Sequence, residues 1–134
     1  MGCPCHSGQL YLQCCQPFHE GKKVDNALQL MRSRYSAYAR GLTAYIIDTT
    51  HPDNPNYNRD HQRWQNELLQ FCKSTHFRGL DILEFIEDEI RSYVTFTAHL
   101  SQEKNDISFT EKSAFEKMGD RWLYREAVDI RRLK

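Results

Sequence analysis

The sequence has 134 residues, enough for one domain with its own hydrophobic core and a small additional module. It carries 18 basic and 18 acidic side chains, so its formal charge is zero, which disfavours a protein that binds nucleic acid through bulk positive charge. No apolar run approaches the roughly 18 residues of a membrane span, and the N-terminus lacks an apolar signal-peptide core, so we expect a cytoplasmic protein.

Four of the five cysteines lie close to the N-terminus, at Cys3, Cys5, Cys14 and Cys15. Without a secretory signal, this cluster predicts a metal site, because four thiolates can close a tetrahedral shell around a structural Zn²⁺. Two disulfides are the main alternative, although a bridge between the adjacent Cys14 and Cys15 is strained. Adjacent ligands also require a turn or a helical end at this point, since a strand would direct them to opposite faces. His6 and His19 are reserve ligands, and either could replace Cys15.

Two helices are predicted in the stretch that follows the cysteines. Asp25 or Asn26 can cap the first helix and Gly41 is placed to end it, while apolar residues recur between them at spacings of three and four. Residues 42–48 are expected to form a second, short helix.

A loop and a third helix come next. Residues 51–58 contain two prolines and three asparagines, which is typical of a loop. Asn58 can cap the third helix, which gives way to a strand near Phe77. Cys72 lies on this helix outside any catalytic motif, so we expect a small buried side chain rather than a nucleophile.

From Leu80 onward the apolar period changes towards two, which predicts an antiparallel meander of strands separated by turns at 104–106 and 118–120. In the first strand, Leu80, Ile82 and Glu84 are expected to share one face, opposite Leu83 and Phe85. The residues expected to share a face in the later strands are Val94, Phe96, Ala98 and Leu100; Ile107, Phe109, Glu111, Ser113 and Phe115; and Trp122, Tyr124, Glu126 and Val128. Helices followed by strands indicate an α+β fold, with N-terminal helices packed on a curved antiparallel sheet that leaves a cone.

The N-terminal stretches 3–8 and 11–15 resemble the SEC-C motif, best known from the C-terminal tail of the SecA preprotein translocase. The resemblance implies one zinc ion held by the four N-terminal cysteines. Two departures occur, because the motif usually has glycine where His6 stands and lysines where Gln9 and Leu10 stand. In the translocase tail these lysines accompany binding to a chaperone or to the ribosome.

Four further stretches resemble the bacterial YchJ family, and they are Leu30–Tyr38, Thr50–Pro52, Glu111–Phe115 and Gly119–Tyr124. Members of that family join a SEC-C motif to a nuclear transport factor 2-like, or cystatin-like, cone domain. The resemblance therefore implies a zinc module at 1–22 and a cone domain at 23–134. Many members carry a second SEC-C motif at the C-terminus, which this sequence lacks. The family has no well-established activity for the resemblance to transfer.

Three residues are candidates for catalysis or ligand binding in the cone, but we favour structural roles for them. Arg32 could bind an anion, His51 could act as a general base, and Glu111 could orient it. A lone loop histidine is more often structural. For Arg32 and Arg34 we favour ion pairs with Glu111 or Glu126 that tie the helix to the sheet.

The first functional hypothesis is a zinc-binding interaction or adaptor protein, whose module contacts a protein partner through Leu10, Tyr11 and Phe18. A small-molecule-binding protein or enzyme that uses the cone pocket is the alternative, and no membrane partner is expected. A third hypothesis is association with RNA or the ribosome. The residues that motivate it are Lys22, Lys23, Arg32, Arg34 and Arg40, interleaved with Tyr11, Phe18 and Tyr35.

Overall fold

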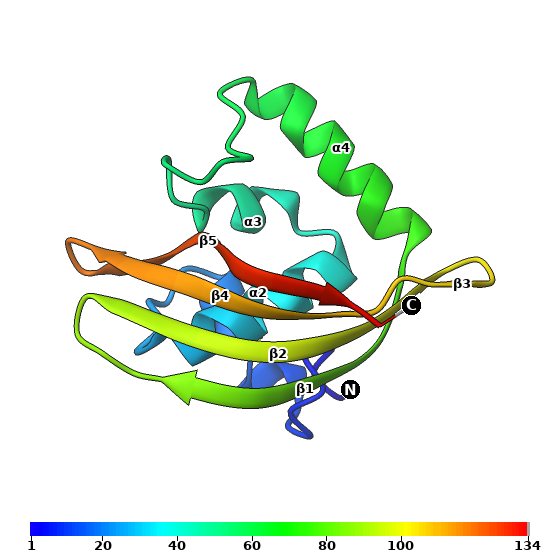
Figure 1. Ribbon diagram of the computed structural model, residues 1–134, viewed down its shortest axis with the longest axis horizontal. Helices are drawn as coiled ribbons and strands as arrows, with labels where there is room; N and C mark the ends of the chain where they lie inside the picture. Colours follow the sequence, from blue (N-terminus) through cyan, green and yellow to red (C-terminus); the bar gives the residue numbers. More distant parts are fainter. Residues whose placement is uncertain (134) are drawn as a thin grey trace.

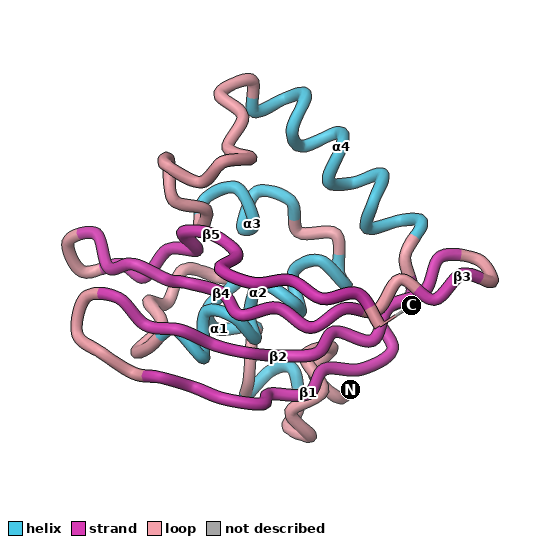
Figure 2. The backbone as a smooth tube through the Cα atoms, viewed as in Figure 1, coloured by secondary structure: helices cyan, strands magenta, loops and turns pink. Residues whose placement is uncertain are grey.

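A curved antiparallel sheet wraps around one long helix in this computed structural model, which describes residues 1–133 (Figures 1 and 2). The elements in chain order are η1 (Tyr11–Gln13), α1 (Gln16–His19), α2 (Ala27–Arg40), α3 (Thr43–Asp48), α4 (His61–Ser74), β1 (His76–Ile86), β2 (Arg91–Gln102), β3 (Asn105–Asp106), β4 (Phe109–Met118) and β5 (Arg121–Arg132). The strand order is β1-β2-β4-β5, with the short β3 paired to β2. The predicted α+β cone is therefore confirmed.

Helix α2 fills the concave side of the sheet, behind the strands in Figure 1. The Asn26 side chain accepts a hydrogen bond from the Gln29 amide at the N-terminus of the helix, as predicted for a cap. Gly41 ends it with a φ of +71°, a left-handed conformation that glycine adopts without strain. The first predicted helix is thus confirmed at both ends.

Helices α3 and α4 pack together with α2, and α4 lies at the top of the view in Figure 1. The predicted cap at Asn58 is wrong, because the side chain that accepts from the first turn of α4 belongs to Asp60. Asn58 instead accepts a hydrogen bond from the Asp60 amide and shapes the turn before the helix. Cys72 is the one buried residue of α4, and burial raises the pKa of its thiol.

Two of the predicted strand faces are interrupted by β-bulges. In β1 the pairing with β2 shifts between Ile82 and Glu84, so Phe85 packs on the core and Leu83 is exposed. Tyr124 of β5 pairs with Phe115 of β4, whereas Glu126 pairs with Ala114, and the register shifts between these two pairs. The extra residue reverses the alternation, and Glu126 therefore lies on the outer face instead of sharing the face of Tyr124 as predicted.

The strands β2 and β4 keep the predicted alternation and form the wall of the main core, which packs against α2. A second core cluster joins α2, α3 and α4 around Ala37, Ile46 and Cys72. None of the helices in residues 1–133 has the length and apolarity needed to cross a lipid bilayer.

Candidate metal centre and cone cavity

The first cysteine pair is held by a short hairpin at the N-terminus. Gly2 and Leu10 pair as an isolated antiparallel bridge, and the Cys3 amide donates to the Gln9 carbonyl over 2.8 Å. Gly8 adopts a φ of +89°, which lets the chain reverse between the bridged residues. This reversal places the second cysteine pair, which follows the hairpin, beside the first.

The second pair occupies the junction between η1 and α1. The Cys14 amide donates to the Tyr11 carbonyl over 3.0 Å, which closes the 3₁₀ turn. Cys15 is the N-cap residue of α1 and its carbonyl accepts from the His19 amide over 3.0 Å. The prediction that adjacent cysteines require a turn or helical end is confirmed.

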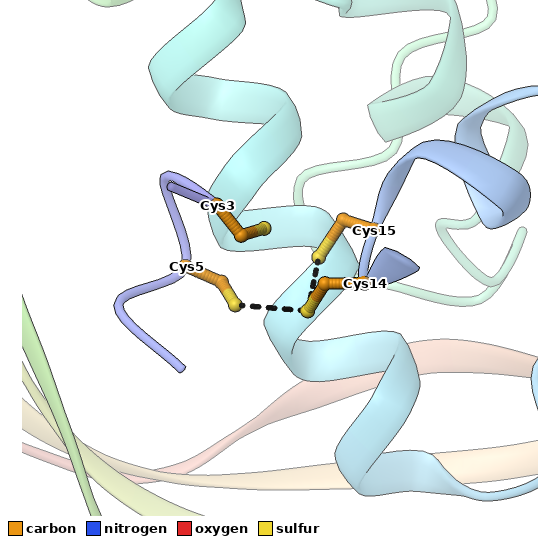
Figure 3. A group of neighbouring side chains, drawn as sticks. All are labelled: Cys3, Cys5, Cys14 and Cys15. Carbon is orange, nitrogen blue, oxygen red and sulfur yellow. Dashed lines mark hydrogen bonds between the residues drawn. The ribbon is translucent and has the colours of Figure 1, made fainter. Parts of the chain in front are cut away.

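All four N-terminal sulfurs lie within 4.8 Å of one another and point toward a common centre (Figure 3). The Sγ–Sγ distances are 3.6 Å between Cys5 and Cys14 and 3.9 Å between Cys14 and Cys15. Four thiolates at Zn–S distances of ~2.3 Å require sulfurs about 3.8 Å apart. A disulfide requires about 2.05 Å, and all five cysteines are free. The cluster therefore has the dimensions of a tetrahedral metal site.

Side chains of α2 contact this cluster. The Arg32 guanidinium lies 3.8 Å from Cys5 Sγ and donates to the Cys5 carbonyl over 3.2 Å. Ser36 Oγ lies 3.8 Å from Cys3 Sγ. A guanidinium and a hydroxyl beside cysteine sulfurs are the kinds of group that form the outer shell of a metal site.

The four sulfurs share charge unequally. The hydrogen bond from the Cys15 side chain lowers the pKa of Cys5 to about 4, although burial opposes this shift. Burial raises the pKa of Cys14 to about 11, against the effect of Ser7 Oγ at 3.3 Å, and the hydrogen bond to Cys5 and burial raise the pKa of Cys15. Cys5 is thus the sulfur that its surroundings favour as the anion that metals bind.

The two reserve ligands lie outside the sulfur cluster. His19 contacts the Ser33 carbonyl through Nε2 over 2.8 Å and the Tyr11 hydroxyl through Nδ1 over 2.6 Å. Burial lowers the pKa of His19, which favours a neutral ring that donates to Ser33 and accepts from Tyr11. The His6 Nε2 lies 3.3 Å from the Phe77 carbonyl of β1. Both rings therefore dock the N-terminal segment on the rest of the fold.

The predicted partner surface is wrong for Tyr11, which is only 7% exposed. Its ring lies under the Arg40 guanidinium at 4.3 Å, and it packs among the cysteines. Tyr11 thus supports the module from within. Leu10 and Leu12 are the exposed apolar residues here, at 48% and 67%, and Phe18 is half-buried.

The predicted basic patch does not form as one exposed surface. Arg34 and Tyr35 are buried, and Arg40 stacks on the module as described above. Lys23 pairs with Asp120 of the β4–β5 turn. The amphipathic helix turns these residues in different directions, so their proximity in sequence does not gather them on one face.

The three candidate catalytic residues do not meet either. Arg32 contacts the cysteine cluster, and Glu111 lines the interior of the cone. His51 accepts from the Asp53 amide through Nδ1 over 2.9 Å, and its Nε2 lies 3.5 Å from the Glu116 carboxylate. The expected pocket of Arg32, His51 and Glu111 is therefore wrong.

The ion pairs expected between α2 and the sheet are also absent from residues 1–133. Arg34 instead donates three hydrogen bonds from Nη1 to the C-terminal end of α3 and the residues after it. Glu126, on the outer face because of the bulge in β5, pairs with Arg91 over 3.3 Å and Arg125 over 3.7 Å. Glu111 accepts hydrogen bonds from hydroxyl groups of the sheet.

The cone contains a cavity of about 210 Å³ between α2, α4 and the sheet. Its lining residues are Met31, Arg34, Tyr35, Tyr38, Phe71, Phe77, Phe96, Ala98, Leu100, Phe109, Glu111, Ser113, Phe115 and Tyr124. Helical spacing alone could have predicted that Arg34 and Arg32 lie on different faces of α2. Arg34 lies three residues after Met31 and four before Tyr38, on the stripe that faces the sheet.

An NTF2-like cone with a four-cysteine N-terminal segment defines the class of this protein. Residues 26–127 match the family described as the YchJ middle NTF2-like domain. A UPF0225 protein of Pectobacterium carotovorum is 33% identical over an alignment of 135 positions, which covers 96% of this chain and 83% of the relative. The chain therefore belongs to the YchJ (UPF0225) family.

Two solved structures share both parts of the molecule. A SEC-C motif containing protein from Rhodopseudomonas palustris is 31% identical with a TM-score of 0.79, covering 96% of this chain and all of that one. One from Psychrobacter arcticus is 26% identical with a TM-score of 0.76, covering 91% of this chain and 78% of that one. The resemblance to SEC-C and YchJ proteins is thereby confirmed.

Proposed function

We propose that this protein binds one structural Zn²⁺ and uses the module that the metal stabilises to contact a protein partner. The observation that carries the metal assignment is the convergence of four sulfurs within 4.8 Å. The proposed ligands are Cys3, Cys5, Cys14 and Cys15. Soft thiolates in a tetrahedral arrangement select zinc over the hard cations that prefer oxygen ligands.

The proposed zinc is structural because four protein ligands leave no coordination position for water or substrate. Three of the four cysteines are buried, and the small core of the module consists of Cys3, Cys5, Tyr11 and Cys15. A segment this short cannot bury enough apolar surface to fold alone. Metal–sulfur bonds would supply the stability that the missing core cannot.

The metal assignment is tested by the zinc content of purified Cys15→Ser, with Cys72→Ser as the matched control. Both positions are buried cysteines, but Cys72 lies in α4, outside the sulfur cluster. We expect one zinc per chain in the wild type and in Cys72→Ser, and a clear loss in Cys15→Ser. Equal zinc content in the two variants would contradict the assignment.

The partner contact is proposed to involve Leu10 and Leu12, which expose apolar surface on the module. The test is affinity capture with zinc-loaded Leu10→Ser/Leu12→Ser, compared with Leu69→Ser on the exposed side of α4. A protein held by the wild type and by Leu69→Ser but lost from the double variant is expected. If every captured protein is unchanged while zinc stays bound, the adaptor role is wrong.

A further inference from the structure

The cone cavity contains two buried groups that can be charged and that the zinc site does not use. Arg34 and Glu111 are each 8% exposed and both line the cavity. Within residues 1–133, Arg34 and Glu111 form no ion pair with each other. Buried charges normally have partners, so their separation across a cavity needs an explanation.

Arg34 presents one edge of its guanidinium without a partner. All three of its hydrogen bonds leave from Nη1, to the Ile46 carbonyl and the hydroxyls of Thr49 and Thr50. In residues 1–133 no fully enclosed side-chain nitrogen or oxygen lacks a partner, so Nε and Nη2 are not fully enclosed, and Arg34 lines the cavity. The parallel Nε–H and Nη2–H groups form the fork that binds a carboxylate in a bidentate manner.

The Glu111 carboxylate, on the sheet side of the cavity, also has one bonded atom and one unbonded atom. Its Oε2 accepts from the Tyr124 hydroxyl over 2.8 Å and from Ser113, which leaves Oε1 unbonded. The Arg34 guanidinium lies over the Tyr124 ring at 4.7 Å from the centroid. Tyr124 therefore separates the cation from the carboxylate while contacting both, and its own pKa is raised by burial and by Glu111.

The remaining walls are apolar and mostly aromatic, with five phenylalanines from α4, β1, β2 and β4 among them. A volume of 210 Å³ equals that of about seven water molecules, so a ligand of roughly ten non-hydrogen atoms fits. Drug-sized ligands need about 300–1,000 Å³. The cavity thus suits a compact molecule with a flat apolar body.

We infer that the cone cavity is a binding site for a small aromatic acid that carries an amino or hydroxyl group beside its carboxylate. The carboxylate occupies the free fork of Arg34, the adjacent donor reaches Oε1 of Glu111, and the ring lies among the phenylalanines. This site goes beyond the proposed zinc function and does not depend on it.

The experiment is calorimetric titration of the zinc-loaded full chain with four compounds that share one ring. Phenylalanine and phenyllactate carry both polar groups, 3-phenylpropanoate lacks the donor, and 2-phenylethylamine lacks the carboxylate. We expect the first two to bind at least about tenfold more tightly, because a buried polar group left unpaired is costly. No saturable binding of phenylalanine or phenyllactate, or equal affinity for all four compounds, would overturn the proposal.

Two variants locate the site, each with an exposed control. Glu111→Gln should weaken phenylalanine more than phenyllactate, because it removes the charge that faces the ammonium group, whereas Glu87→Gln should change neither. Arg34→Lys should weaken both ligands about tenfold or more, with Arg59→Lys unchanged. If Arg34→Lys does not fold, a ligand-induced shift of the wild-type Arg34 Nε–H resonance supplies the same information. Binding that Glu111→Gln leaves intact, or that does not shift this resonance, contradicts the assigned site.

Discussion

At the scale of single residues, two arginines of α2 contact different parts of the molecule because they are two positions apart. Two positions along an α-helix turn a side chain by about 200°. Arg32 therefore faces the cysteine module, where it contacts Cys5, and Arg34 faces α3 and the cone cavity. Each guanidinium is held by fixed acceptors, so neither is a freely solvated surface charge.

Replacing Arg32 with methionine should weaken zinc binding about 10–100-fold, the usual effect of losing an outer-shell partner of a metal ligand. The variant keeps much of the side-chain volume but removes the positive charge 3.8 Å from the Cys5 sulfur. Competition with a chromophoric chelator measures the affinity, and Arg59→Met serves as the exposed control. Identical affinities for the two variants would show that Arg32 does not act on the metal.

Tyr35 provides a prediction for alkaline pH. Burial raises the pKa of its hydroxyl to about 12, and this hydroxyl donates to the Gly79 carbonyl over 2.9 Å. The unfolded chain ionises this group near pH ~10, so the contribution to stability is complete below that pH and is lost towards pH 12. Tyr35→Phe should cost about 1 kcal/mol at neutral pH.

The same variant should lose less stability than the wild type between pH ~10 and ~12, because it has no hydroxyl to ionise. Urea unfolding at a series of pH values measures both effects. A wild-type free energy of unfolding that falls no faster than that of Tyr35→Phe in this window would contradict the prediction.

At the scale of elements, α2 contacts the module, the other helices and the concave side of the sheet along its whole length, so its ends should matter most. Asn26→Ala removes the hydrogen bond to the Gln29 amide and should lower the free energy of unfolding by ~1 kcal/mol. Asp60→Ala removes the equivalent cap of α4, which buries only Cys72, and should have a smaller effect. Chemical denaturation compares them, and a larger effect of Asp60→Ala would refute this order.

The elements themselves were largely predictable because their signals are local. Capping residues and apolar spacing predicted α2, and strict alternation predicted the faces of β2 and β4. The errors at Phe85 and Glu126 arose from β-bulges. A bulge is decided by how two strands pair, and one strand's periodicity does not contain that information.

The same distinction explains the sites. The cysteine cluster could be predicted because its ligands lie within fifteen residues of one another and four soft donors share one chemistry. The expected pocket of Arg32, His51 and Glu111 failed because its members come from three distant elements. Their orientation depends on the helical phase of α2 and on the path of the loop after α3.

At the scale of the whole molecule, the N-terminal module is built into the fold through α2. Ser33 accepts from His19, Ser36 contacts Cys3, and the His6 ring reaches β1 through the Phe77 carbonyl. Ser33 and Ser36, the residues of α2 at these contacts, are fully buried. Loss of the metal should therefore affect the cone domain as well as the module.

Removing the metal with a chelator should lower the melting temperature on the order of 10 °C, because ligand binding far above its dissociation constant contributes several kcal/mol. Differential scanning calorimetry before and after chelation measures the change. Restoring Zn²⁺ under reducing conditions should recover the original transition. A melting temperature that is unaffected by chelation, with zinc removal verified, would show that the metal in the module does not stabilise the fold.

X-ray absorption spectroscopy at the zinc edge of the purified full-length protein tests the central claim most directly. Four cysteine ligands predict a shell of four sulfurs at ~2.3 Å with no nitrogen or oxygen ligand. A mixed shell containing histidine nitrogen or water would show that Cys3, Cys5, Cys14 and Cys15 do not form the complete site. A protein purified under reducing conditions without zinc, and unable to take it up, would contradict the assignment altogether.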